Sequence, residues 1–175
     1  MSEIIGYNTI GISSGNISAS HIIVSARSAP SVSGTVESIE LYSSNVNASL
    51  DMKVGIYEDN GGVPGALIGT SSEFTDTGTW SVGWKLFGGL NFSVTGGIYY
   101  WLVAQASANF VQYYNTIAGT NRHWNEVTAY GNPWPDPFSS STSSGAKYSI
   151  RATVTAAGGS AIPVFMHHYL HSMGR

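Results

Sequence analysis

The sequence contains no cysteine. This absence excludes disulfide bonds, thiolate metal sites and cysteine nucleophiles. Charged residues are scarce too: they make up 10% of the 175 residues, against roughly 25% in an ordinary soluble domain. Ser, Thr, Asn and Gly must therefore cover the surface, which has few of the charges that keep monomers apart. We expect neighbouring subunits to cover part of it.

The chain also lacks a basic stripe and a long apolar run. Its seven Lys and Arg residues are scattered singly and its net charge is -3, so nucleic acid is not an expected partner. No apolar run approaches the roughly 18 to 20 residues that span a bilayer. The segment Met1–Tyr7 has neither the basic nor the apolar region of a secretory signal. We expect no membrane contact and synthesis in a host cytoplasm.

Alternation of apolar and polar residues is the clearest pattern that is present. It runs through Leu50–Ile56, Trp80–Leu86 and Tyr148–Val154 with a period of two, which is typical of strands with one buried face. The second of these segments places Trp80 and Trp84 on its buried face. We therefore assign both indole rings to the core.

The segment Gly97–Gln105 is apolar on both faces and predicts a central strand that is covered twice, with Trp101 in the core. Turn-forming clusters separate the predicted strands, and no amphipathic helix lies between them. We predict an all-β fold, an antiparallel β-sandwich of jelly-roll type, over residues 1–156. Weaker strands are predicted at Ile17–Ala26, Val36–Tyr42, Ala66–Ser71, Leu90–Val94 and Phe110–Thr116.

Two stretches break the strand pattern. Residues 121–145 hold three prolines and a run of serines, and they predict a long ordered loop or an excursion across one end of the sandwich. Residues 157–175 begin with a flexible Gly-Gly-Ser hinge and continue as an apolar tail. The tail is too short to fold alone, so we expect it to contact this domain or a neighbouring subunit. The predicted assembly contacts are Ile162, Val164, Phe165, Met166, Tyr169 and Leu170.

Two motifs carry a family resemblance. Gly55–Gly65 reads G-I-Y-E-D-N-G-G-V-P-G, and Val94–Ala104 contains G-I-Y-Y-W-L-V-A. Together they resemble a jelly-roll module of phage structural and bacterial surface proteins, over about residues 35 to 155. The resemblance implies a sandwich without catalytic residues. Many of the surface proteins carry a signal peptide and an anchor, so the absence of both patterns favours a phage-type protein located in the virion.

Metal binding is a minor alternative at two places. The Asn60-Gly61-Gly62 turn predicts a structural hairpin, although Glu58, Asp59 and Asn60 offer oxygen ligands that suit calcium. His167, His168 and His171 are close in sequence, but no Glu between them could act as the base of a zinc enzyme. A partly polar contact surface is the favoured interpretation of the histidines. We predict no metal and no cofactor.

Sugar binding is the main alternative function. The proline-rich stretch holds four aromatic residues, and two prolines flank Trp134 and would hold its ring outward. Exposed rings of this kind stack on sugars. The favoured interpretation is that the rings cap the open end of the sandwich. The candidate ligand or partner contacts are Trp124, Tyr130, Trp134 and Phe138.

Catalysis is not expected. Glycoside hydrolysis needs two carboxylates across a cleft, whereas Glu73, Asp76, Glu126 and Asp136 lie in or beside loops without a partner motif. Serine is abundant, but we expect no nucleophile elbow of the G-x-S-x-G type, because that motif needs a turn from a strand into a helix.

The sequence thus predicts a non-enzymatic virion structural protein, either a capsid decoration or a tail or fibre component. We expect a homo-oligomer that also contacts a capsid or tail protein, held by an N-terminal arm, Met1–Ile12, and by the tail. The alternative is a carbohydrate-binding or host-recognition module.

Overall fold

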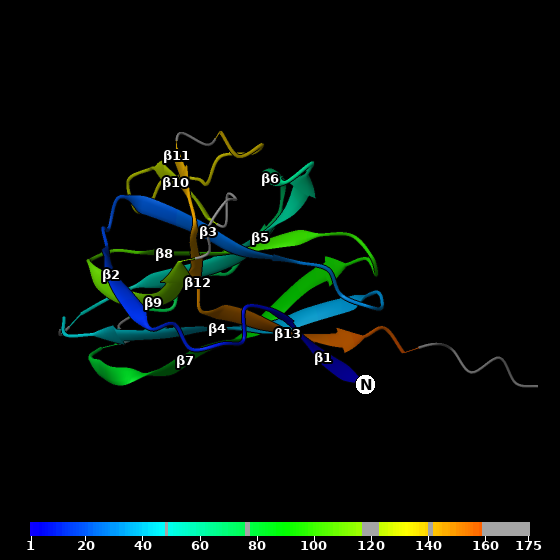
Figure 1. Ribbon diagram of the computed structural model, residues 1–175, viewed down its shortest axis with the longest axis horizontal. Coiled ribbons are helices and arrows are strands. Elements are labelled where there is room, and N and C mark those ends of the chain that lie inside the picture. Colours follow the sequence, from blue (N-terminus) through cyan, green and yellow to red (C-terminus); the bar gives the residue numbers. More distant parts are fainter. Residues whose placement is uncertain (48, 76–77, 117–122, 140–141, 159–175) are drawn as a thin grey trace, which may run out of the picture.

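Two antiparallel sheets stack to form a sandwich (Figure 1). The computed structural model describes residues 1–158 apart from 48, 76–77, 117–122 and 140–141. Within these residues the chain forms thirteen strands and no helix, so no described helix is long and apolar enough to cross a membrane. The predicted all-β, antiparallel architecture is confirmed.

The seven-stranded sheet is built around a central strand, β4. On one side β4 pairs with β13 and, near its end, with β9, while β7 pairs along the other side. In the described part of the chain, β7 has no other strand partner. The strands are β1 (Ser2–Gly6), β2 (Ser13–Ile17), β4 (Gly34–Asn45), β7 (Trp80–Val94), β9 (Phe110–Thr116), β12 (Ala146–Tyr148) and β13 (Ile150–Ala156).

The six-stranded sheet has the order β11-β10-β3-β8-β5-β6. Its β5–β6 hairpin carries the Gly-Gly-Val-Pro-Gly motif, in which Gly61 and Gly62 have φ values of +67° and +96°. This left-handed backbone favours glycine and explains the motif. The strands are β3 (His21–Ser28), β5 (Met52–Asn60), β6 (Val63–Thr70), β8 (Tyr100–Ala106), β10 (His123–Val127) and β11 (Thr142–Ser144).

The main core lies between the two sheets and contains the alternating residues of two predicted strands. The apolar residues of Leu50–Ile56 and of Tyr148–Val154 are all buried in it. Every residue of β8 is buried, because Tyr100 and Leu102 face the main core while Trp101 and Val103 belong to a second cluster. These three strand predictions, and the burial of Trp101, are confirmed.

Strand β7 differs from the strand that alternation predicts at Trp80–Leu86. Its pairing with β4 is irregular near Asn45, so Trp80 turns toward the main core while Val82, Trp84 and Leu86 lie on the outer face of the sheet. Trp80 is half-buried at the edge of the core, and Leu86 is 59% exposed. A bulge adds a residue to one strand and reverses which residues face inward. The assignment of Trp84 to the core was therefore wrong.

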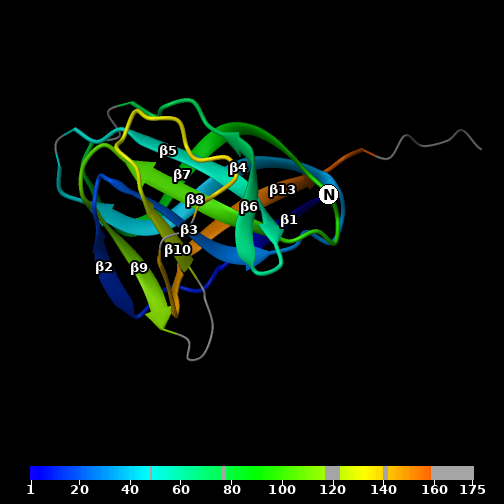
Figure 2. The ribbon, with the colours of Figure 1, turned by 90° about the horizontal axis from the view of Figure 1, so that it is seen from above.

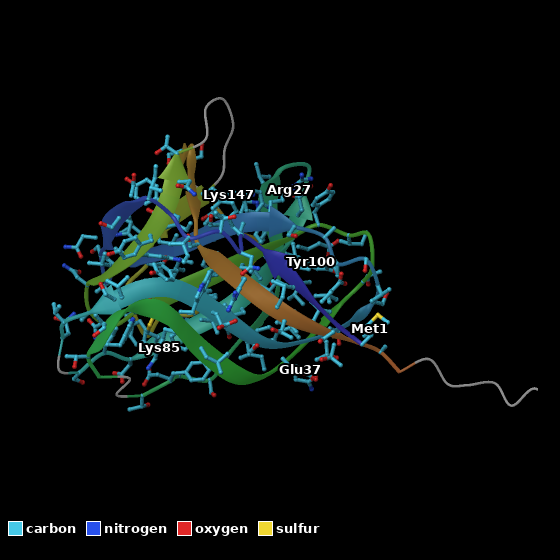
Figure 3. The ribbon with its side chains drawn as sticks, turned by 60° about the horizontal axis from the view of Figure 1, so that its bottom comes forward. Met1, Arg27, Glu37, Lys85, Tyr100 and Lys147 are labelled. Atoms are coloured by element: carbon cyan, nitrogen blue, oxygen red, sulfur yellow. The ribbon has the colours of Figure 1, made fainter. Side chains whose placement is uncertain are left out.

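The N-terminal segment contributes a strand to the sandwich. Strand β1 pairs with β13 through all five of its residues, and Ile5 is buried in the main core. The Ala156 amide donates a hydrogen bond of 2.9 Å to the Met1 carbonyl oxygen. Figure 3 shows Met1 beside this end of β13. Ser2–Gly6 is therefore an edge strand of this chain, and the intersubunit contact of Met1–Ile12 stays a prediction.

Candidate functional site

The proline-rich stretch covers the outer face of the six-stranded sheet. Residues 128–139, here called the covering loop, follow β10 and cross over β5 and β8 (Figure 2). Trp134 and Phe138 are each only 7% exposed. The expectation that Trp134 points outward was wrong. The two rings join a second buried cluster with Ile22, Val24, Tyr57, Trp101 and Val103.

Hydrogen bonds fix the covering loop to the sheet and explain the direction of its indole ring. The Trp134 Nε1–H donates to Gln105 Oε1 at 2.7 Å, and Gln105 Nε2 donates to the Thr128 carbonyl at 2.7 Å. The Tyr57 hydroxyl donates to the Pro135 carbonyl, also at 2.7 Å. Flanking prolines stiffen the backbone but do not choose a direction. The direction of the ring is set by burial of the indole and by the hydrogen bond that its N–H makes.

The remaining predicted ring contacts are Tyr130 and Trp124, and in the described residues they form no exposed aromatic surface for a sugar. Tyr130 is half-buried, and the Lys53 ammonium lies 5.0 Å from the centroid of its ring. Burial, together with the nearby Glu73 carboxylate, raises the pKa of Tyr130. Trp124 lies in β10, but its side chain is outside the described part of the structure. The capping interpretation also needs correction, because Trp134 and Phe138 cover a sheet face and not an open end.

A charged network at the β5–β6 hairpin accounts for Asp59. Its carboxylate accepts hydrogen bonds from Arg27 Nε and Nη2 at 2.7 and 2.8 Å, from Trp101 Nε1 at 2.7 Å, and from the Gly62 amide. Burial alone would raise the pKa of Asp59, but the hydrogen bonds from Arg27, Gly62 and Trp101 lower it overall.

This network gives the Asp59 carboxylate partners other than calcium. The guanidinium of Arg27 occupies the place of a cation beside Asp59, and it also stacks on Tyr99 at 3.9 Å from the ring centroid. Within the described ranges, no three His, Asp or Glu residues lie close enough together to hold a metal. The hairpin motif has a structural role, because the buried Asp59 carboxylate on β5 binds Arg27 on β3 and Trp101 on β8.

Several predicted residues lie outside the described residues. These include the histidine cluster, Asp76 and the side chain of Glu126. Glu73 is exposed, and Asp136 accepts a hydrogen bond from the Leu67 amide at 3.0 Å, which helps to hold the covering loop. The predicted tail contacts, which also lie outside, are Ile162, Val164, Phe165, Met166, Tyr169 and Leu170.

The outer face of the seven-stranded sheet carries a row of aromatic rings. Tyr42 lies between Trp84 and Tyr113, with ring centroids 5.5 and 5.3 Å apart and edge-to-face geometry. Arg151 lies 4.1 Å above the Trp84 ring and forms two hydrogen bonds, of 2.8 and 3.0 Å, with Glu40. No second buried cluster forms over this face in the described part of the chain. In the described part of the chain this face is therefore uncovered, and its aromatic rings lie beside an ion pair.

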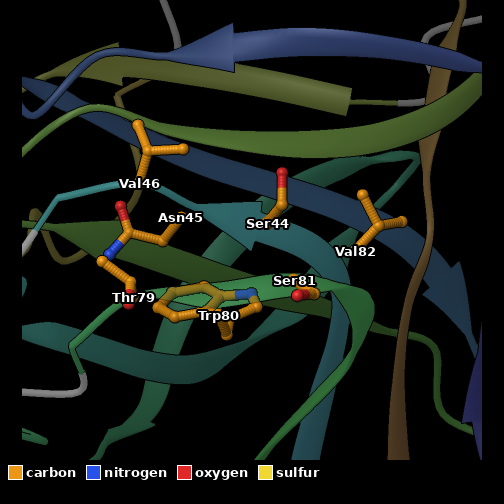
Figure 4. A pocket seen from close by; sticks show the side chains of 7 residues that line it. All are labelled: Ser44, Asn45, Val46, Thr79, Trp80, Ser81 and Val82. Atoms are coloured by element: carbon orange, nitrogen blue, oxygen red, sulfur yellow. The ribbon is translucent and has the colours of Figure 1, made fainter.

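A groove lies between the end of β4 and the start of β7, with a volume of about 710 Å³ (Figure 4). The Trp80 Nε1–H donates to the buried Ser43 Oγ at 3.3 Å, which anchors the indole. Asn45 Nδ2 donates to the carbonyls of Gly78 and Asn47 at 2.7 and 3.1 Å and so joins the two walls. The lining residues are Ser44, Asn45, Val46, Thr79, Trp80, Ser81 and Val82.

Sequence reasoning did not identify this groove. Asn45 and Trp80 are far apart in the chain and face each other only through the pairing of β4 with β7. Neither residue belongs to a recognisable motif. The only available signal was the tryptophan at the start of a predicted strand, and it indicated core.

Comparison with known proteins adds no family assignment. No protein-family model, curated protein or solved structure matches the chain. The family resemblance therefore stays a prediction from two sequence motifs. The surfaces of this chain are what bears on its function.

Proposed function

We propose that this chain is a non-enzymatic structural protein of a phage-type particle. In this proposal it is a jelly-roll sandwich that decorates or reinforces a capsid, or forms part of a tail or fibre. It is made in the host cytoplasm and acts in the virion through protein–protein assembly. The uncovered outer face of the seven-stranded sheet carries the proposal, because its apolar and aromatic side chains gain from burial against another subunit.

The partner that fits this face best is a second copy of the chain. The charges at its centre, Arg151 and Glu40, bind each other at 2.8 Å, so two copies can approach without strong like-charge repulsion. The exposed Leu86 and the half-buried Trp84 offer apolar area beside them. Burial of such area contributes roughly 25 cal/mol per Å².

The free edge of β7 is a poorer contact than the face. The strand is irregular at two places along β4, and Lys85 lies among its inward-facing residues. Bulges and inward-pointing lysines are features that oppose edge-to-edge pairing. We therefore propose that subunits pack through sheet faces, with additional contacts from the tail residues Ile162–Leu170, and not by strand addition.

The oligomeric state tests the contact at the face. We expect the wild-type protein to be a stable oligomer in size-exclusion chromatography with light scattering, and Leu86→Lys to be a folded monomer, because a buried ammonium would lack a partner. Ile68→Lys and Val127→Lys make the same change at exposed apolar positions of the other sheet. Both controls should assemble as the wild type does. A monomeric wild type at high concentration, or normal assembly of Leu86→Lys, would refute the proposal.

A truncation tests the tail separately. Removal of residues 160–175 should leave the sandwich folded, because its described strands end at Ala156, and should abolish assembly. If the truncated protein assembles normally while Leu86→Lys does not, the face is the contact and the predicted role of the tail is wrong.

The alternative function has lost part of its basis. A carbohydrate-binding or host-recognition site on the proline-rich stretch would need exposed rings, yet Trp134 and Phe138 of the covering loop are buried against the sheet. A glycan contact at that stretch is therefore not proposed.

A further inference from the structure

The groove beside Trp80 combines an indole ring with hydroxyl groups, and none of its described lining residues is charged. We infer that it binds an uncharged saccharide, at a site that adjoins the proposed subunit contact at Val82. A pyranose ring has an apolar face of C–H groups and a rim of hydroxyls. The groove offers a matching surface for each.

The indole of Trp80 is held in place before any ligand arrives. The ring is half-buried against the main core, and its N–H is bonded to Ser43. The Lys85 ammonium lies 5.0 Å from the ring centroid but does not line the groove. A fixed ring costs little conformational entropy on binding. Trp80 can therefore serve as a rigid surface on which a sugar ring packs.

Three hydroxyl groups surround the indole. Thr79 and Ser81 lie on either side of it and Ser44 lies across the groove (Figure 4). The structure gives these hydroxyls no hydrogen-bond partner among the residues it describes. Each can donate one hydrogen bond and accept others, as each sugar hydroxyl can. They can therefore bind the hydroxyls of a sugar whether these donate or accept the hydrogen bond.

The shape and charge of the groove narrow the class of ligand. A volume of about 710 Å³ lies within the range of roughly 300–1,000 Å³ usual for small-molecule sites. An ionic ligand would find no opposite charge among the described lining residues, and a purely apolar one would leave the hydroxyls unpaired. The walls are preformed, because the buried Asn45 side chain joins them through Gly78 and Asn47. A neutral oligosaccharide satisfies all of these conditions.

Binding to defined oligosaccharides tests the inference. We would measure wild-type binding to maltohexaose, cellohexaose, chitohexaose and anionic oligogalacturonate by isothermal titration calorimetry, after a survey on a glycan array. Wild type should bind at least one neutral sugar, and Trp80→Ala should weaken that binding by at least about tenfold. The matched control is Trp84→Ala, which removes an indole from the outer face and leaves the groove intact. Its affinity should equal that of the wild type.

A second variant guards against a folding defect in Trp80→Ala. The double substitution Thr79→Val and Ser81→Val keeps the indole and removes two exposed hydroxyls, so the melting temperature should not change. Its affinity should also fall by at least about tenfold. The inference is overturned if no neutral sugar binds, if only the anionic sugar binds, or if the double variant binds as tightly as the wild type.

Discussion

The outer faces of the two sheets differ in whether the described chain covers them. On the six-stranded sheet, Trp134 and Phe138 of the covering loop bury the face, and the Trp134 N–H donates a hydrogen bond to Gln105. On the seven-stranded sheet, Trp84 and Tyr42 pack edge to face at the surface, and Arg151 stacks on top. The comparison teaches that one sandwich can use the same residue types as core or as contact surface. The difference is whether the chain itself lies over them.

The largest expected effect is at the covered face. Trp134→Ala should lower the free energy of unfolding by about 3–5 kcal/mol, since it empties the second cluster and leaves the buried Gln105 Oε1 without its donor. Urea unfolding followed by circular dichroism measures the change.

The matched substitution on the uncovered face is Trp84→Ala, measured at a concentration where the protein is monomeric. It should cost about 1 kcal/mol, because the half-buried ring makes only the surface contacts with Tyr42 and Arg151. Equal losses in the two variants would show that the two faces do not differ as described.

A smaller effect is expected at the charged network that borders the covered face. Asp59→Asn keeps an acceptor for Trp101 but removes the charge that holds Arg27, and it should cost about 1–3 kcal/mol. Glu58→Gln is the same chemical change one residue away, and it should stay within about 0.5 kcal/mol of wild type. A cost in Glu58→Gln as large as in Asp59→Asn would contradict the special role of Asp59.

The stabilisation by Asp59 should also depend on pH. Because its pKa in the folded protein is below the ordinary value of 3.8, the unfolded chain takes up the proton first as the pH falls. The contribution is therefore complete above that value and is lost as the pH drops through the folded-state pKa. The difference in unfolding free energy between wild type and Asp59→Asn should shrink in acid titrations below pH 3.8. A constant difference would rule out this source of stability.

The smallest changes in the free energy of unfolding are expected for substitutions of two leucines, one on each sheet. Leu67 packs partly against the second cluster, whereas Leu86 is 59% exposed. Leu67→Ser should cost about 1–2 kcal/mol, and Leu86→Ser should change the stability of the monomer by less than about 0.5 kcal/mol. Thermal unfolding of dilute protein measures both. A large loss in Leu86→Ser would mean that this chain already covers the face.

Strands with one buried face were predictable from sequence because alternation follows directly from the geometry of a strand. Leu50–Ile56 and Tyr148–Val154 needed no knowledge of their neighbours. Trp80–Leu86 shows the same alternation but was placed wrongly, because its inward residues are set by a bulge against β4. The first strand, Ser2–Gly6, was also missed, since five residues give little periodicity.

The surfaces were harder to predict than the strands. The direction of Trp134 depends on Gln105, 29 positions away in sequence, and the groove depends on the pairing of Trp80 with Asn45. Such long-range partners leave no local pattern. The sequence did indicate a loop at residues 128–139 and a structural turn at Gly61-Gly62, because both depend on local backbone chemistry, but it missed strands β10 and β11 on either side of that loop.

Strand β4 gives the sandwich two distinct poles. It begins at Gly34, which pairs with Ala156 next to Met1, and it ends at Asn45 in the wall of the groove. The strand has twelve residues, and the steps from its first residue to its last, at about 3.3 Å each, place these points about 36 Å apart. A partner joined at either end of the described chain is thus held at the pole opposite the groove. A molecule fastened in this way presents the groove outward.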